Sequence, residues 1–218
     1  HCIRNLLREN QPFTMRAGGT SIGGQAIGSG VLVDISKHLT SITYFSESKR
    51  EVTVDPGVIQ DDLNHFLEPY NLKFATDNST SNRAMIGGMI GNNSCGSYSI
   101  FYGTTRDHVK SVEVILSDGS LVEFKELNEQ ELDAKLNLKT LEGDIYRFVI
   151  NLLKDNNDRI LSAFPDKSLI RRNTGYALDE LIRQHKPFNI NGKGFNLATL
   201  MCGSEGTLGV IVRAKLNL

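Results

Sequence analysis

The first third of the chain alternates between strand-like and helix-like patterns of apolar and polar residues. Helical spacing predicts a short helix over 2–10, and the apolar stretch 13–17 predicts a strand. The continuous apolar run 31–36 indicates a buried strand, whereas the alternation in 50–57 is typical of a half-buried strand. Apolar residues at helical spacing then predict a helix over 58–70. This part of the chain is therefore expected to be mixed α and β.

The remaining two thirds contain a clearer hairpin and a longer helical pattern. Two alternating stretches within 109–124 flank Asp118 and Gly119, and Asp-Gly is a strong signal for a hairpin turn. The polar segment 126–142 predicts a surface helix or loop. The last ten residues, "GVIVRAKLNL", predict a strand. One helical face is expected to carry Ile145, Phe148, Val149, Leu152 and Leu153.

This order of elements predicts an α+β domain spanning 1–218. We expect two lobes, about 1–75 and about 76–218, with a cleft between them. The chain begins without methionine and ends in strand-like sequence, so we interpret it as an excised domain that further sequence follows.

Composition and charge narrow the class of protein. The 218 residues are 39% hydrophobic and 22% charged. A chain of this length can form one sizeable hydrophobic core that is stable without disulfide bonds or metal ions. A net charge of −1 gives no support for nucleic-acid binding, and no apolar run has the length of a membrane span. Three widely spaced cysteines, without a CxxC pair, argue against a disulfide framework or a metal site. We therefore expect a soluble, cytoplasmic protein.

Three stretches, 15–30, 85–108 and 203–209, concentrate glycine. Such clusters place main-chain N–H groups where an anion such as phosphate can approach closely. The alternative is a tight connection between strands that needs positive φ. The sequence holds no G-x-x-x-x-G-K-[ST] stretch, and "GTSIGG" does not supply the dinucleotide pattern G-x-G-x-x-G.

Taken in order, "RAGGTS", "IGGMIGNNSCG", "YGTTRDH" and "GSEGTLGVI" resemble the PCMH-type FAD-binding domain of the vanillyl-alcohol oxidase superfamily. The resemblance covers nearly the whole chain. Two further stretches, "STSNRAMIGGMIGNNSCGS" and "RRNTGYALDEL", are most similar to the FAD-linked D-2-hydroxyacid dehydrogenases, such as the D-lactate, glycolate and D-2-hydroxyglutarate enzymes. The family fold has two lobes with FAD in the cleft between them.

The resemblance implies which residues bind FAD. Main-chain N–H groups of the first stretch would wrap the diphosphate, the second stretch would pass along the flavin, and the third would border the adenine and isoalloxazine. The residues implied are Arg16, Gly18, Gly19, Thr20, Ser21, Gly24, Gln25, Pro56, Gly87, Gly88, Asn92, Asn93, Cys95, Gly96, Ser97, Tyr102, Gly103, Thr104, Asp107, Gly203, Glu205, Gly206 and Ile211. Two alternatives stay open: Glu205 could instead cap a helix, and Cys95 could be a reactive thiol.

The resemblance also implies the chemistry. A hydride leaves the α-carbon of a 2-hydroxy acid for the flavin, which gives a 2-oxo acid. Relatives with covalently attached flavin carry histidine where this chain has Thr20, so FAD is expected to be bound non-covalently. Electrons would pass to an acceptor outside this chain, namely an iron–sulfur domain, a quinone or a cytochrome. The whole protein could associate peripherally with the inner membrane face.

The catalytic base is not identified from the sequence. In the family it comes from a cap domain C-terminal to the FAD domain, so we expect this chain to fold but not to turn over substrate. Within the chain, His108 is the candidate among the five histidines, and Arg171, Arg172 and Asn173 could face the substrate or solvent. His38 and His185 are expected in polar loops. Two alternatives to a D-2-hydroxyacid dehydrogenase stay open: a non-catalytic electron-transfer subunit and an enzyme like UDP-N-acetylenolpyruvylglucosamine reductase.

Overall fold

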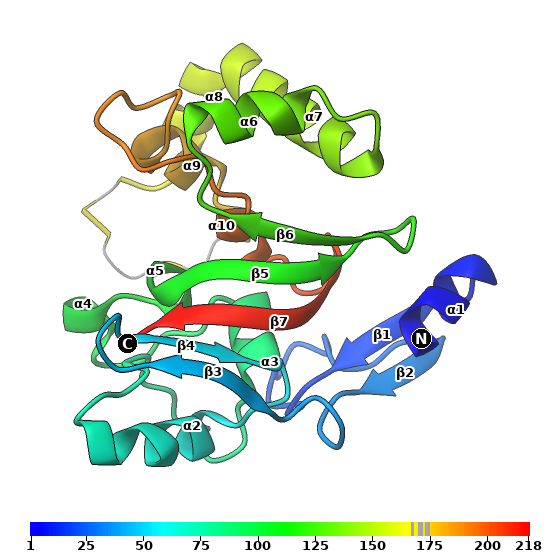
Figure 1. Ribbon diagram of the computed structural model, residues 1–218, viewed down its shortest axis with the longest axis vertical. Coiled ribbons are helices and arrows are strands. Elements are labelled where there is room, and N and C mark those ends of the chain that lie inside the picture. The colour runs from blue at the N-terminus through cyan, green and yellow to red at the C-terminus, as the bar shows by residue number, and fades with distance from the viewer. Residues whose placement is uncertain (167, 170–171, 173–174) are drawn as a thin grey trace.

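The computed structural model describes residues 1–166, 168–169, 172 and 175–218, which form two sheets with helices around them (Figure 1). The strands are β1 (Phe13–Arg16), β2 (Val31–Asp34), β3 (Ile42–Ser46), β4 (Glu51–Val54), β5 (Val109–Ile115), β6 (Leu121–Lys125) and β7 (Val210–Asn217). The helices are α1 (Cys2–Arg8), α2 (Gln60–Leu67), α3 (Ile86–Gly91), α4 (Ser99–Tyr102), α5 (Thr105–His108), α6 (Glu129–Leu136), α7 (Leu141–Asp155), α8 (Asn157–Ala163), α9 (Leu178–Gln184) and α10 (Ala198–Met201), with a 3-10 turn η1 (Glu68–Tyr70).

The larger sheet has five strands in the order β3-β4-β7-β5-β6, and every neighbouring pair is antiparallel. The last strand of the chain, β7, therefore lies at its centre. The smaller sheet pairs β1 with β2 in parallel and stands beside the larger one (Figure 1). The division expected near residue 75 does not separate these sheets, because β3 and β4 precede it and pair into the larger sheet.

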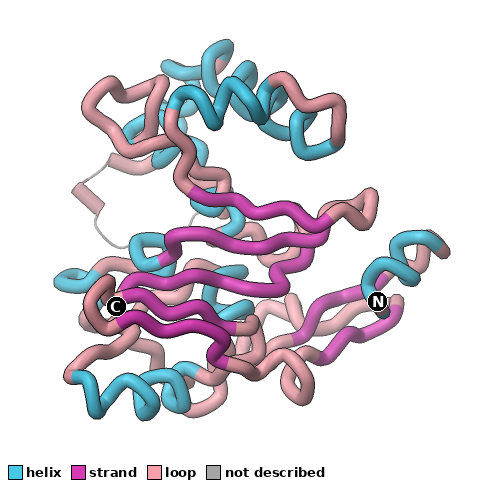
Figure 2. The backbone as a smooth tube through the Cα atoms, in the orientation of Figure 1, coloured by secondary structure: helices cyan, strands magenta, loops and turns pink. Residues whose placement is uncertain are grey.

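Loops and the short helix α3 lie between the two sheets, whereas α6 to α9 lie beyond the β6 edge (Figure 2). Apolar side chains of β4, β5, β7, α2 and α3 form one buried core; among them are Val52, Leu63, Ile86, Val112 and Leu216. This core fixes α3 against the larger sheet. No helix within the described ranges combines the length and the apolar character needed to cross a membrane.

The predicted hairpin is confirmed. Strands β5 and β6 pair from Ser111 with Lys125 to Ile115 with Leu121, around the Asp118-Gly119 turn. Gly119 has a φ of 81°, which favours glycine, and an oxygen of Asp118 accepts a hydrogen bond from the Ser120 N–H. Hydrogen bonds from Ser120 also lower the pKa of the Asp118 carboxyl.

Two predictions about strand burial were wrong. Val31 and Leu32 of β2 are 40% and 44% exposed, because β2 belongs to a two-stranded sheet that is not sandwiched between layers. Glu51 of β4, in contrast, is buried between Lys110 and Lys215 of the neighbouring part of the larger sheet. Hydrogen bonds from these two lysines lower the pKa of the Glu51 carboxyl despite its burial.

The structure also differs from the predictions for the buried face of α7 and for the location of His185. The buried stripe of α7 is Tyr146, Val149, Ile150 and Leu153, and Phe148 is 67% exposed on the other side of the helix. His185 does not lie in a polar loop but is buried, because its ring bonds to the Gly194 carbonyl and the Thr199 hydroxyl. Burial lowers the pKa of the His185 imidazole.

Candidate functional site

A cleft of about 780 Å³ lies where the three glycine-rich stretches meet. Residues 17–23 and 25–27, from the connection between the two strands of the smaller sheet, form one wall. The helix α3 and the residues after it form a second wall, and the loop 204–211 before and into β7 forms the third. Segments up to about 190 residues apart in the sequence thus share one concave surface, whose volume is in the range typical of small-molecule sites.

The first wall exposes main-chain N–H groups without internal partners. Among the described residues, the N–H groups of residues 18–23 donate no hydrogen bond. Gly18 lies so close to Arg83 that a Cβ would stand 2.3 Å from the Arg83 carbonyl oxygen, and Gly19 has a φ of 62°. A larger residue at position 18 would thus overlap the main chain, and the backbone conformation at position 19 favours glycine. The unpaired donors suit an anionic ligand.

The second wall is fixed by the main chain around α3. The Ile86 N–H donates to the Val58 carbonyl and the Gly87 N–H to the Pro56 carbonyl, which ties the start of α3 to the turn after β4. Ile86, Met89 and Ile90 point into the core, so the helix is held by apolar burial on that side. Gly87 lies against Pro56, where a Cβ would stand 2.6 Å from the proline Cβ. The cleft side of α3 is consequently formed largely by Gly87, Gly88 and Gly91, together with Met89.

The third wall is joined directly to the second. The Gly203 N–H donates to the Ile90 carbonyl over 3.0 Å, and the Glu205 N–H donates to the Gly91 carbonyl over 2.8 Å. Glu205 has a φ of 48°, a conformation that non-glycine residues adopt rarely and that is often found at functional sites. The loop therefore presents Glu205 and its neighbours to the cleft in a defined conformation.

The cleft has few ionisable side chains. Among the described residues that line it there is no lysine, arginine, histidine or aspartate, and only Glu205 and Cys95 carry carboxyl or thiol groups. A bound diphosphate would thus be stabilised by main-chain N–H groups rather than by side-chain cations. Within the part of the chain that the structure describes, the lining therefore offers no histidine as a general base and no arginine for a substrate carboxylate.

The structure brings together many of the residues implied by the sequence, and places others elsewhere. Those lining the cleft are Gly18, Gly19, Thr20, Ser21, Gln25, Pro56, Gly87, Gly88, Asn92, Cys95, Glu205, Gly206 and Ile211. Those outside its lining are Arg16, Gly24, Asn93, Gly96, Ser97, Tyr102, Gly103, Thr104, Asp107 and Gly203.

Several of the outlying residues have local structural partners. Asp107 accepts hydrogen bonds from the N–H and hydroxyl of Thr104, which forms a capping box at the start of α5. Asn93, which is buried with a φ of 50°, accepts a hydrogen bond from the Arg106 N–H over 2.8 Å. These residues support the second wall from behind and do not face the cleft.

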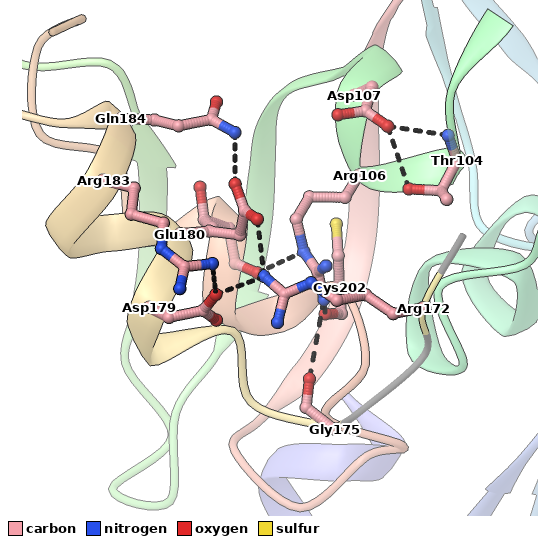
Figure 3. Close-up of polar contacts among 11 residues, drawn as sticks. Thr104, Arg106, Asp107, Arg172, Gly175, Asp179, Glu180, Arg183, Gln184 and Cys202 are labelled. Atoms are coloured by element: carbon pink, nitrogen blue, oxygen red, sulfur yellow. Dashed lines mark hydrogen bonds and ion pairs between the residues drawn. The ribbon is translucent and has the colours of Figure 1, made fainter. Parts of the chain in front are cut away.

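The candidate catalytic side chains also lie away from the cleft. The His108 ring bonds to the Tyr102 carbonyl over 2.8 Å and packs edge-on against Phe74, 5.5 Å between ring centroids. Arg172 forms ion pairs with Asp179 and Glu180 of α9 (Figure 3). Arg171 and Asn173 lie outside the described residues. None of the described candidates is positioned to contact a molecule in the cleft.

Sequence reasoning missed a polar part of the cleft. Asn78, Ser79 and Thr80 line it, as do Ser204 and Thr207 of the third wall. The run "DNSTSN" (77–82), with small hydrogen-bonding side chains just before the second glycine stretch, is the signal that could have identified the first three.

Comparison with known proteins gives one family and a consistent set of relatives. A family model described as "FAD binding domain" matches residues 1–125. The D-2-hydroxyglutarate dehydrogenases of Pantoea ananatis and Escherichia coli are 36% and 37% identical to the chain over 206 residues; each match covers 94% of this chain and 19% of the relative. Glycolate oxidase subunit GlcD of Bacillus subtilis is 37% identical over 112 residues, which covers 51% of this chain and 24% of that subunit. The chain thus spans about one fifth of the length of the first two relatives.

Solved structures share the fold at low sequence identity. An alkyldihydroxyacetonephosphate synthase superposes with a TM-score of 0.60 at 15% identity, covering 99% of this chain and 30% of that one. The 6-hydroxy-D-nicotine oxidase of Arthrobacter nicotinovorans superposes with a TM-score of 0.59 at 14% identity, covering 99% and 32%. The mixed α and β architecture is therefore found in proteins with different activities.

Proposed function

Since this chain belongs to the FAD binding domain family, we propose that it is the FAD-binding portion of a dehydrogenase that oxidises a D-2-hydroxy acid to the 2-oxo acid. The observation that carries the proposal is the convergence of three distant glycine-rich segments on one cleft with unpaired N–H donors. The similarity to D-2-hydroxyglutarate dehydrogenases along 94% of the chain supports the substrate class. D-2-hydroxyglutarate, D-lactate and glycolate are the substrates to test.

The residues present fit FAD. The N–H groups of residues 18–21 would hold the diphosphate, because they lack internal partners among the described residues and no side-chain cation replaces them. Asn92 and Thr80 offer hydrogen bonds to the ribityl chain and the flavin edge, whereas Pro56 and Ile211 offer apolar contact. When bound, the flavin supplies the hydride acceptor of the reaction.

The rest of the active site is proposed to lie outside the cleft lining. Oxidation of a hydroxyl requires a group that accepts its proton, and recognition of a carboxylate favours arginine. His108 and Arg172 are engaged in other contacts, so neither serves these purposes here. We infer that a cap domain supplies both groups, and that an iron–sulfur domain, a quinone or a cytochrome accepts the electrons.

A non-catalytic electron-transfer subunit is the second candidate. The lack of histidine, lysine and arginine among the described cleft residues favours it, because such a subunit needs only to hold the flavin. The two functions differ in whether a D-2-hydroxy acid reduces the bound flavin.

The test is an absorption spectrum of the full-length protein, loaded with FAD under anaerobic conditions. Addition of D-2-hydroxyglutarate or D-lactate is expected to bleach the flavin band near completely, whereas the L-enantiomers leave it unchanged. Absence of bleaching by any 2-hydroxy acid would favour the electron-transfer subunit. Bleaching by NADPH alone would instead indicate an enzyme like UDP-N-acetylenolpyruvylglucosamine reductase.

FAD is expected to be released completely by acid precipitation. Thr20 lines the cleft, and its hydroxyl is a poor nucleophile for covalent attachment compared with an imidazole nitrogen. The flavin in the supernatant is measured by fluorescence and identified by chromatography. Yellow colour retained in the pellet would contradict non-covalent binding, and FMN in the supernatant would contradict the assignment of FAD.

A further inference from the structure

Arg106 of α5 connects to two separate segments behind the cleft. Its guanidinium donates to the carbonyls of Thr199, Cys202 and Gly175, with Nε 3.3 Å from the Thr199 oxygen and Nη2 3.5 Å from the Gly175 oxygen. Figure 3 shows this side chain reaching from α5 towards Cys202 and Gly175. Thr199 and Cys202 belong to one segment, α10 and the residue after it, whereas Gly175 lies in the chain before α9. A planar fork of donors suits such a divergent set.

These contacts fix the start of the third wall. Gly203, next to Cys202, has a φ of 102°, and a Cβ there would stand 2.6 Å from the Gly175 oxygen and 3.3 Å from Arg106 Nη2. Immediately after it, Ser204, Glu205 and Gly206 line the cleft. The bond from Arg106 to Cys202 therefore helps to fix where these three residues lie.

Arg106 is coupled to the second wall as well. Its own N–H donates to the Asn93 side chain over 2.8 Å, just beyond the C-terminal end of α3. One residue thus holds the second and third walls at a fixed separation. The direct bonds from Gly203 to Ile90 and from Glu205 to Gly91 reinforce the same junction.

Electrostatics set this arginine apart from an ordinary surface arginine. Among the described residues, Arg106 forms no ion pair, because Asp107 is bonded to Thr104 and Asp179 is paired with Arg172 and Arg183. Burial lowers the pKa of its guanidinium. A partly buried charge that bonds only to carbonyls is costly to accommodate, and its geometric role accounts for it.

We propose that Arg106 is a positioning residue for the cofactor, acting through the third wall of the cleft. The inference rests on the proposed function, because it assumes that FAD occupies this cleft. Loss of the guanidinium frees the 203–206 segment to move relative to α3. The contacts between that segment and FAD are then lost. The surroundings of the bound flavin also become less asymmetric.

The test compares Arg106→Met with Arg147→Met. Arg147 of α7 is the control, because its guanidinium also binds two main-chain carbonyls, those of Leu136 and Leu138, away from the cleft. Unlike Arg106, it also pairs with Asp144. Arg106→Met is expected to raise the FAD Kd at least about tenfold and to weaken the visible circular dichroism of the flavin at saturating FAD. Arg147→Met is expected to change the Kd less than about twofold, at a similar loss of Tm.

The conservative variant Arg106→Lys separates charge from geometry. A single ammonium cannot replace a fork of donors that spans three carbonyls on two segments, so the FAD Kd of this variant is expected to rise at least about fivefold. If Arg106→Met does not fold, Arg106→Lys is compared with Arg147→Met instead. Equal shifts of Kd at positions 106 and 147, or a wild-type Kd for Arg106→Lys, would overturn the inference alone. A wild-type protein that binds no FAD would overturn the proposed function and, with it, this inference.

Discussion

Replacing Gly96 with alanine is expected to lower the free energy of unfolding by at least about 3 kcal/mol. A Cβ at this position would stand 1.2 Å from the carbonyl oxygen of Asp77 and 2.3 Å from its carbonyl carbon. Both atoms belong to the main chain, so no side-chain rotation relieves the overlap and one of the two segments must move. Asn78, next to Asp77, and Cys95, next to Gly96, line the cleft, so FAD affinity should fall together with stability.

Urea denaturation followed by circular dichroism measures the effect. Gly91→Ala is the control: Gly91 ends α3, and a Cβ there would make an ordinary contact of 3.8 Å with the Glu205 Cα. Alanine favours the helix by about 1 kcal/mol over glycine, so this variant should be as stable as the wild type or slightly more so. Equal stability of Gly96→Ala and the wild type would show that the two segments do not approach closely.

Local signals predicted the parts of the fold that depend on neighbouring residues. The hairpin of β5 and β6 follows from Asp118-Gly119 and the flanking alternation, and α2 follows from apolar spacing before Pro69. Burial could not be predicted in the same way. The apolar run in β2 is exposed because of the sheet it joins, and Glu51 is buried because two lysines distant in sequence meet it.

For the site, the sequence predicted which segments form the cleft but not which individual residues line it. Glycine clusters indicated which segments approach a ligand, because a missing Cβ is a local property. They could not indicate which neighbours point into the cleft. Asp107, within the second stretch, caps its own helix, whereas Ser204 and Thr207 line the cleft through the chain path set by Gly203. The role of Arg172 likewise depended on α9 folding back towards it, which no local pattern encodes.

Replacing Gly18 with alanine is expected to raise the FAD Kd at least about 100-fold, equivalent to about 2.7 kcal/mol. The new Cβ would stand 2.3 Å from the Arg83 carbonyl oxygen, so the loop 17–21 must move away from residue 83. That displacement would misplace the N–H groups proposed to hold the diphosphate. Hydrogen bonds to a charged group contribute about 1.5–3 kcal/mol each, so loss of one or two of them accounts for the expected change.

Gly23→Ala provides the matched comparison within the same loop. Its Cβ would meet only the terminal amide of Gln25, at 2.9 Å from Nε2, and that side chain can rotate away. This variant should therefore bind FAD within about threefold of the wild type. Quenching of FAD fluorescence on titration with protein gives both constants, and thermal unfolding establishes that each variant is folded. Similar affinities for the two alanine variants would mean that the first glycine stretch is only a tight connection between β1 and β2, and that the diphosphate is held elsewhere.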